Sequence, residues 1–114
     1  MSRHEDMVSL RQMRDHAHEA MVLIQGRLQE DLESDRTLEL SVVRLLEIVG
    51  EAASRVSKKM RDDSNRIPWA QVIGLRNRLI HAYDSVDIEI VWEILHRDIP
   101  SLIVELDRLL PSAE

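Results

Sequence analysis

The sequence contains no cysteine and no phenylalanine, and two tryptophans and one tyrosine are its only aromatic residues. Without cysteine the chain can form neither a disulfide framework nor a thiol-based catalytic site. Without phenylalanine the core must be built from Leu, Ile, Val and Met. So few aromatic rings also disfavour recognition of single-stranded nucleic acid by base stacking, and we expect Trp69 and Trp92 to lie in the core or at an interface.

Long apolar runs and phosphate-binding glycine loops are also missing. No run approaches the length that spans a membrane, and Met1–Asp6 lacks the pattern of a signal peptide, so we expect a soluble, cytoplasmic protein with no membrane partner. Without glycine-rich loops we expect no cofactor. His16 and His18 point about 160° apart on a helix, which excludes a shared ion, and we expect no metal site.

The 114 residues suffice for one domain, residues 1–114, and their apolar spacing is helical. The sequence predicts an all-α fold, an antiparallel bundle of four helices with a polar connection at Gln29–Asp35. Pro68 suits the first turn of the third helix, Asp87 can cap the fourth, and Pro100 should kink or split that helix near His96–Ile99. The expected helices are Arg3–Gln29, Thr37–Met60, Pro68–Tyr83 and a fourth that begins after Asp87. Gly50, within the second helix, predicts close packing against another helix.

The net charge of −6 argues against a general nucleic-acid binder, but the charges are unevenly distributed. Residues 54–81 hold 7 basic and 2 acidic side chains, whereas residues 1–53 hold 6 and 11, and residues 82–114 hold 2 and 8. Lys58, Lys59, Arg66 and Arg78 could therefore contact RNA. The alternative is a solvated loop and helix end, with Lys58 and Lys59 stabilised at the C-terminus of the second helix.

An arginine, an asparagine, a histidine and the tyrosine fall within eight residues, at Arg76, Asn77, His81 and Tyr83. On one continuous helix Arg76 would lie within the apolar stripe, where burying an unpaired ion is costly. Arg76 must therefore meet a carboxylate, open into a cleft or bind an anion. The candidate carboxylates are Glu47 and Glu51, one turn apart, although we expect Glu47 to lie on the surface. Ala70, Gly74, Asn77 and His81 would form a neighbouring stripe that could line a groove.

These residue types suit cleavage of an RNA phosphodiester. Imidazole can exchange protons near neutral pH with the 2′-hydroxyl or the leaving 5′-oxygen, and a guanidinium fork matches phosphate oxygens, so no metal is needed. On an ideal helix, however, Arg76 and His81 lie about 140° apart. Either the helix loosens between Ile80 and Tyr83, or a symmetric dimer brings the two groups together.

The order Arg76, Asn77, His81, Tyr83 resembles the Arg-Asn-x-x-x-His-x-Tyr signature of the HEPN superfamily, in its branch of HepT-like toxins. The similarity extends through flanking blocks: Ile48–Ala53, Ile67–Trp69, Val86–Trp92 and Asp98–Pro100. The resemblance implies an all-helical homodimer and a metal-independent ribonuclease with Arg76 and His81 as catalytic residues. It also implies a minimal nucleotidyltransferase antitoxin as partner, which silences the toxin by attaching adenylate to Tyr83.

Two hypotheses follow. In the first, the protein is an endoribonuclease toxin in which Asn77 positions the phosphate or His81. In the second, it is a non-catalytic helical dimer that acts as a docking or regulatory partner of a nucleotidyltransferase. Arg76 is then an ion-paired structural residue and His81 a helix-end residue.

Overall fold

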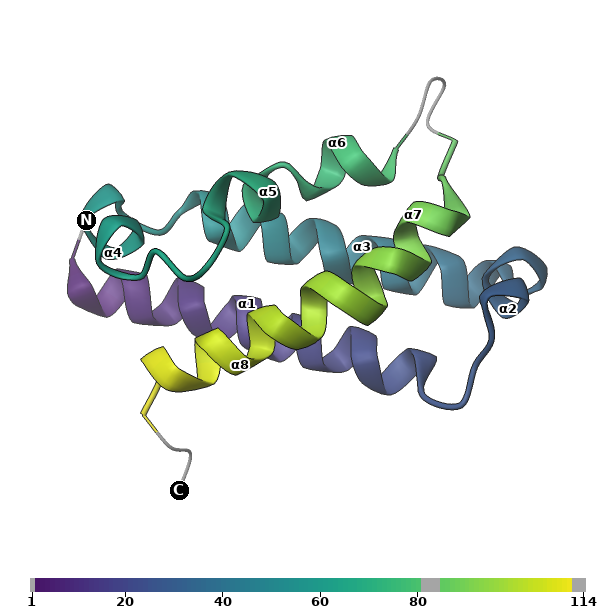
Figure 1. The fold of residues 1–114 in the computed structure, drawn as a ribbon, viewed down its shortest axis with the longest axis horizontal. Helices are drawn as coiled ribbons and strands as arrows, with labels where there is room; N and C mark the ends of the chain where they lie inside the picture. The colour runs from purple at the N-terminus through teal and green to yellow at the C-terminus, as the bar shows by residue number, and fades with distance from the viewer. Residues whose placement is uncertain (1, 81–84, 112–114) are drawn as a thin grey trace.

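Two long antiparallel helices form the base of the fold. The computed structural model describes residues 2–80 and 85–111. Helix α1 (Arg3–Ile24) and helix α3 (Arg36–Ser54) run in opposite directions and make the most extensive helix pair, with the short α2 (Gln29–Ser34) between them (Figure 1). Their facing sides supply fully buried Leu10, Met13, Val42, Leu46 and Val49. The expectation of a core without phenylalanine is therefore met by aliphatic side chains and methionine.

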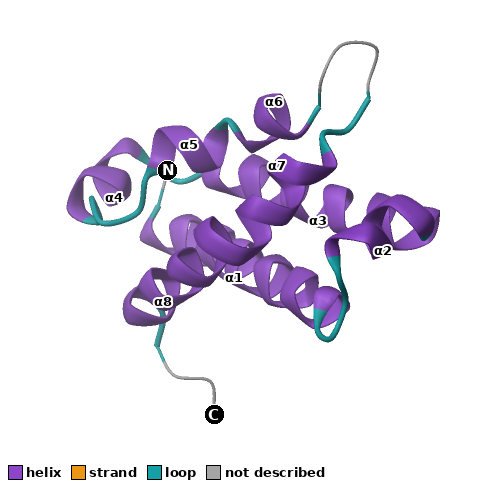
Figure 2. Cartoon of the chain, turned by 45° about the vertical axis from the view of Figure 1, so that its right-hand side comes forward, coloured by secondary structure: helices purple, strands orange, loops and turns teal. Residues whose placement is uncertain are grey.

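The remaining helices are short pieces laid on this pair. They are α4 (Lys58–Asp63), α5 (Trp69–Ile73), α6 (Leu75–Leu79), α7 (Ile88–Glu93), the π-helical η2 (Ile94–Asp98) and α8 (Ile99–Leu109). Helices α5 and α6 pack on α3, and α8 packs across α1. Figure 2 shows only helices and loops among the described residues, which confirms the all-α prediction. No helix within these residues has both the length and the apolar character needed to cross a membrane.

Several local signals act as the sequence predicts. The Asp87 carboxylate accepts a hydrogen bond from the Ile90 amide at 3.2 Å and caps α7. Pro100 follows a π-helical turn in which the Ile99 amide reaches the Ile94 carbonyl, so the last helix is irregular where predicted and continues to Leu109. A Cβ on Gly50 would lie 3.0 Å from the Val72 carbonyl oxygen, which confirms the close approach of another helix.

The first two helices are shorter than predicted. Helix α1 ends at Ile24, before Gly26 in a left-handed conformation (φ 74°), and the expected polar connection from Gln29 contains α2. Helix α3 ends at Ser54 instead of Met60. A contact from α1 is the reason: the buried Asp6 carboxylate accepts hydrogen bonds from the Ser57 amide and hydroxyl at 2.8 and 2.6 Å. Ser57 is thereby fixed in extended conformation and caps α4, which begins at Lys58.

The third predicted helix is interrupted and also ends early. It begins at Trp69, one residue after the predicted start, with Pro68 at the N-cap. Gly74 separates α5 from α6, and α6 ends at Leu79 instead of Tyr83. Trp69 at its start is buried, and its indole donates a hydrogen bond to the Ser64 carbonyl at 3.0 Å, which confirms the core assignment. Trp92 is half-buried.

Candidate functional site around Arg76

The five-residue helix α6 carries the first two motif residues, Arg76 and Asn77. Its start is fixed by the close contact of α5 with Gly50 of α3, and its end by Ile80, which is extended with φ −108° and ψ 121°. Ile80 forms an antiparallel bridge with Val86, and the Asp87 amide donates a hydrogen bond to the Leu79 carbonyl at 3.2 Å. The chain therefore leaves α6 at Ile80 and is held beside it again at Val86.

The two remaining motif residues, His81 and Tyr83, lie outside the described residues. Helix α6 ends at Leu79 and Ile80 is extended, so the helix that carries Arg76 ends before His81, and both routes that could bring the two groups together stay predictions. The angle of about 140° expected on an ideal helix therefore does not apply beyond this point.

Arg76 lies on the surface and is ion-paired. Its side chain is 65% exposed, so the prediction that it lies within a buried stripe is wrong. The break at Gly74 explains the difference, because the spacing of one continuous helix does not continue from α5 into α6. Its Nε lies 3.3 Å from Glu47 Oε2, so the prediction that Arg76 meets Glu47 or Glu51 is confirmed for Glu47.

Glu47 is the centre of a small ionic network on α3. Its side chain is only 16% exposed, so the expectation that it lies on the surface is wrong. Its second oxygen, Oε1, lies 3.8 Å from Arg44 Nη1, and the same nitrogen donates a hydrogen bond to Glu51 at 3.2 Å. Glu47 therefore contacts both Arg76 and Arg44, and Arg44 also contacts Glu51.

Arg44 was not predicted as a site residue. It lies in the acidic first half of the sequence, away from the basic segment, so the charge distribution did not point to it. The available signal was its spacing: Arg44 precedes Glu47 by three residues and Glu51 by seven, which places all three on one face of a helix.

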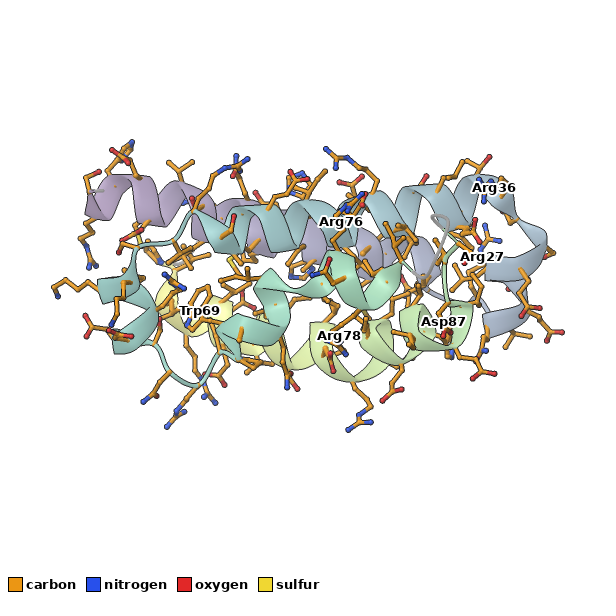
Figure 3. All side chains as sticks on the ribbon, turned by 90° about the horizontal axis from the view of Figure 1, so that it is seen from above. Arg27, Arg36, Trp69, Arg76, Arg78 and Asp87 are labelled. Carbon is orange, nitrogen blue, oxygen red and sulfur yellow. The ribbon has the colours of Figure 1, made fainter. Side chains whose placement is uncertain are left out.

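Arg78 faces the opposite way from Arg76. Residues two positions apart on a helix point about 160° apart, and Figure 3 shows Arg76 on the side of α6 nearer α3 and Arg78 on the side nearer the last helices. Arg78 Nη1 lies 2.8 Å from Asp98 Oδ2 without hydrogen-bond alignment, and the two side chains are 37% and 34% exposed. Arg78 therefore joins α6 to η2.

The other predicted RNA contacts lie away from α6. Lys58 and Lys59 pair with Asp62 and Asp63 at 2.7 and 3.2 Å along α4. They occupy the first turn of α4, so their predicted place at the C-terminus of the second helix is wrong. Figure 1 shows α4 beside the start of α1, with α5 between it and α6. Arg66 is exposed and lines an open groove of about 470 Å³ with Gln71, Arg97 and Ser101, among other residues.

Asn77 is exposed on α6 directly after Arg76. The stripe that was expected to run from Ala70 to His81 is interrupted at Gly74, which ends α5 and begins α6. Ala70 instead lines a concavity with Lys58, Arg61 and Trp69, among other residues. Among the described residues, Ala70 and Asn77 therefore lie on two separate helices and not on one continuous stripe that could line the predicted groove.

His16 and His18 of α1 have different surroundings. His16 Nδ1 lies 2.7 Å from the Gln12 carbonyl of its own helix, and His18 is exposed. Within residues 2–80 and 85–111 no group of three or more His, Asp or Glu side chains is placed to hold an ion.

Comparison with known proteins connects the motif to a family. A sequence profile described as "Ribonuclease HepT-like" matches residues 8–109. The "Putative RNase TTE0752" of Caldanaerobacter subterraneus subsp. tengcongensis is 36% identical over 87 residues, covering 76% of this chain and 78% of that protein. The "Probable ribonuclease HepT" of Thermococcus cleftensis is 36% identical over 80 residues, covering 70% of this chain and 73% of that protein. No solved structure matches the chain.

Proposed function

Because the chain belongs to the HepT-like ribonuclease family of the HEPN superfamily, we propose that it is a metal-independent endoribonuclease with Arg76 and His81 as catalytic residues. One observation of the structure supports this most. Arg76 is exposed, and its ion pair with Glu47 uses Nε. The exposed guanidinium of Arg76 is therefore accessible to a phosphate, which it can bind with two hydrogen bonds.

The proposed step is an internal transfer at phosphorus. The 2′-oxygen of RNA attacks the adjacent phosphorus while the P–O5′ bond breaks, which gives a 2′,3′-cyclic phosphate and a 5′-hydroxyl. Imidazole accepts the 2′-hydroxyl proton, and a protonated imidazole supplies the proton to the 5′-oxygen. Arg76 stabilises the charge on the non-bridging oxygens, and Asn77, next to it on the exposed turn, positions the phosphate or His81.

The proposed step needs a neutral imidazole as the base and a protonated imidazole as the acid at the same phosphate. A homodimer of antiparallel four-helix units would supply two histidines, one for each role, and we propose this assembly. Of the additional RNA contacts, Arg66 has no ion pair among the described residues. Lys58, Lys59 and Arg78 would have to exchange a carboxylate for a phosphate, which reduces the net gain.

We further propose that the protein is the toxin of a cytoplasmic toxin–antitoxin pair. A minimal nucleotidyltransferase would transfer AMP from ATP to the Tyr83 hydroxyl, releasing pyrophosphate. Tyr83 follows His81 by two residues, so the added phosphate would bring negative charge and bulk next to the catalytic histidine and exclude RNA.

A second candidate function is favoured by the ion pair itself. A non-catalytic dimer that docks a nucleotidyltransferase would use Arg76 as a paired structural residue, and Arg76 is paired with Glu47. The exposure of Arg76 favours the nuclease, because an exposed ion pair adds little stability and leaves the guanidinium accessible to RNA.

An RNA-cleavage assay in EDTA distinguishes the ribonuclease from the non-catalytic docking dimer. Wild-type protein and His81→Ala are compared, with circular dichroism to show that the variant is folded. We expect cleavage by the wild type and its loss in the folded variant. Equal cleavage by both proteins would refute the role of His81, and cleavage by neither would favour docking.

The modification is tested by intact mass after incubation with ATP and the nucleotidyltransferase. We expect the wild type to gain adenylate mass and to lose cleavage, and Tyr83→Phe to gain none. The same mass increase on Tyr83→Phe would refute the assignment.

A further inference from the structure

The geometry points to Glu47 as a positioning residue for Arg76, with Arg44 as the residue that orients Glu47. This inference rests on the proposed ribonuclease function and extends it to a second helix. Glu47 is proposed to touch neither RNA nor the reacting atoms. It holds the guanidinium of Arg76 at Nε, so that the two terminal nitrogens face the substrate.

Burial identifies Glu47 as the fixed member of the pair. Its side chain is 16% exposed, against 65% for Arg76, and it lies on the 19-residue helix α3, whereas Arg76 lies on the five-residue α6. A carboxylate on a long packed helix is the better ordered group. The flexible arginine therefore takes its orientation from Glu47.

Both carboxylate oxygens of Glu47 have cationic partners. Oε2 lies 3.3 Å from Arg76 Nε, and Oε1 lies 3.8 Å from Arg44 Nη1. Arg44 in turn donates a hydrogen bond to Glu51 at 3.2 Å. Glu51 lies one turn after Glu47 on the same helix but has no ion pair with Arg76 among the described residues. The chain thus provides two glutamates that share Arg44 and differ in their contact with Arg76.

The position of Glu47 beside Nε of Arg76 determines which edge of the guanidinium faces the substrate. A guanidinium can bind an oxyanion pair along its Nε edge or end-on through both terminal nitrogens. Glu47 Oε2 lies 3.3 Å from Nε, so we infer that the end-on fork is the edge that binds phosphate. Holding that fork in place before RNA arrives lowers the ordering cost in the transition state, where misplacement by about 1 Å costs on the order of 100-fold in rate.

A positioning role and a simple charge effect predict opposite results. Removing a negative charge beside an RNA-binding surface should by charge alone strengthen RNA binding, lower KM and leave kcat unchanged. Loss of positioning should lower kcat and change KM little, because the contact matters most in the transition state.

The experiment measures kcat and KM for RNA cleavage in EDTA by full-length wild type, Glu47→Gln and Glu51→Gln. We expect Glu47→Gln to lower kcat by about 10- to 100-fold and Glu51→Gln to change it by less than about threefold. Glu47→Asp, which keeps the charge, should recover part of the loss. Urea unfolding of each variant shows whether the assay contains folded protein.

Arg76→Lys completes a double-mutant cycle. A lysine keeps the charge but has no Nε edge, so adding Glu47→Gln to Arg76→Lys should cause little further loss if Glu47 acts through Arg76. Losses that multiply, or equal kcat in Glu47→Gln and Glu51→Gln, would overturn the positioning role while the nuclease function stands. A wild type that does not cleave RNA would overturn the function first, and this inference with it.

Discussion

Arg76 and Arg78 lie two residues apart on α6, and each meets a carboxylate from another helix in a different way. Arg76 is largely exposed, and its partner Glu47 is nearly buried within α3. Arg78 and its partner Asp98 are each about one-third exposed, between α6 and the π-helical turn η2. In one pair a fixed carboxylate holds a guanidinium that faces solvent. In the other pair, both groups are partly buried, and the contact joins α6 to η2.

The difference separates two uses of the same residue type on one short helix. Five residues are too few for a stable isolated helix, so α6 depends on its neighbours on both sides. Arg78–Asp98 joins it to the last helices, and Arg76–Glu47 joins it to α3. We expect the exposed arginine to serve chemistry and the half-buried one to serve stability.

The largest effect should come from truncating the exposed arginine. Arg76→Ala should lower kcat for RNA cleavage by about 100- to 1000-fold, because a charged donor to the transition state is lost. The matched variant Arg78→Ala should keep kcat within about threefold of wild type. Both are measured in EDTA, with circular dichroism to confirm folding. Similar kcat values for the two variants would remove the distinction between the two arginines.

The sequence predicted those features that depend on a few neighbouring residues. The Asp87 cap, the irregular helix before Pro100 and the close approach at Gly50 are all seen. The apolar spacing predicted the all-α fold, the absence of phenylalanine predicted a core of Leu, Ile, Val and Met, and the motif indicated the family. Each of these follows from local backbone chemistry or from a linear pattern.

Features set by contacts between distant residues were not predictable. The end of α3 depends on Asp6 binding Ser57 across 51 positions of sequence, and no local signal places it. The exposure of Arg76 depends on the break at Gly74, which removes the register of one continuous helix. Arg44 was not predicted, because it lies in the acidic part of the sequence and its role depends on its contacts with Glu47 and Glu51 on α3.

The second effect concerns stability alone. Burial raises the pKa of Asp6, but hydrogen bonds from the Ser57 hydroxyl and amide outweigh it and hold the pKa below its usual value. Asp6→Asn should therefore lower the free energy of unfolding by about 2 kcal/mol at pH 7, because a charged acceptor is lost from a buried site. Urea unfolding measures this, and kcat should remain unchanged.

The pH dependence of the Asp6 contact follows from the direction of this shift. A lowered folded-state pKa stabilises the protein above the unfolded value of about 3.9, and the contribution is lost as pH falls through the folded value. The difference between wild type and Asp6→Asn should therefore shrink below about pH 4. As control, Asp15→Asn removes an exposed carboxylate and should change stability by less than about 0.5 kcal/mol. A difference that stays constant with pH would contradict the assignment.

A smaller change should move α6 relative to α3. The Cβ of Gly50→Ala would meet the Val72 carbonyl oxygen at 3.0 Å and push α5 outward. We expect a net loss of about 1 kcal/mol, since the clash exceeds the gain in helix propensity. Cleavage should also fall, because the Arg76–Glu47 distance increases.

Gly26→Ala is the matched control for this displacement. Its left-handed φ of 74° makes the substitution strained, yet nothing lies within 4 Å of the added Cβ. A stability loss of about 1 kcal/mol is expected here too, without loss of kcat. If both glycine variants lose cleavage equally, lower stability and not the geometry of α6 is the cause.

The smallest effect is expected at the second ion pair. Arg78→Ala and Asp98→Ala should each lower the free energy of unfolding by about 0.5–1 kcal/mol, because both side chains are only partly shielded from water. The double variant should lose less than the sum of the single variants, since the second substitution removes a partner already lost. Additive losses would show that the contact contributes nothing, and α6 would then depend on apolar packing through buried Leu75 and Leu79 and on its ion pair with Glu47.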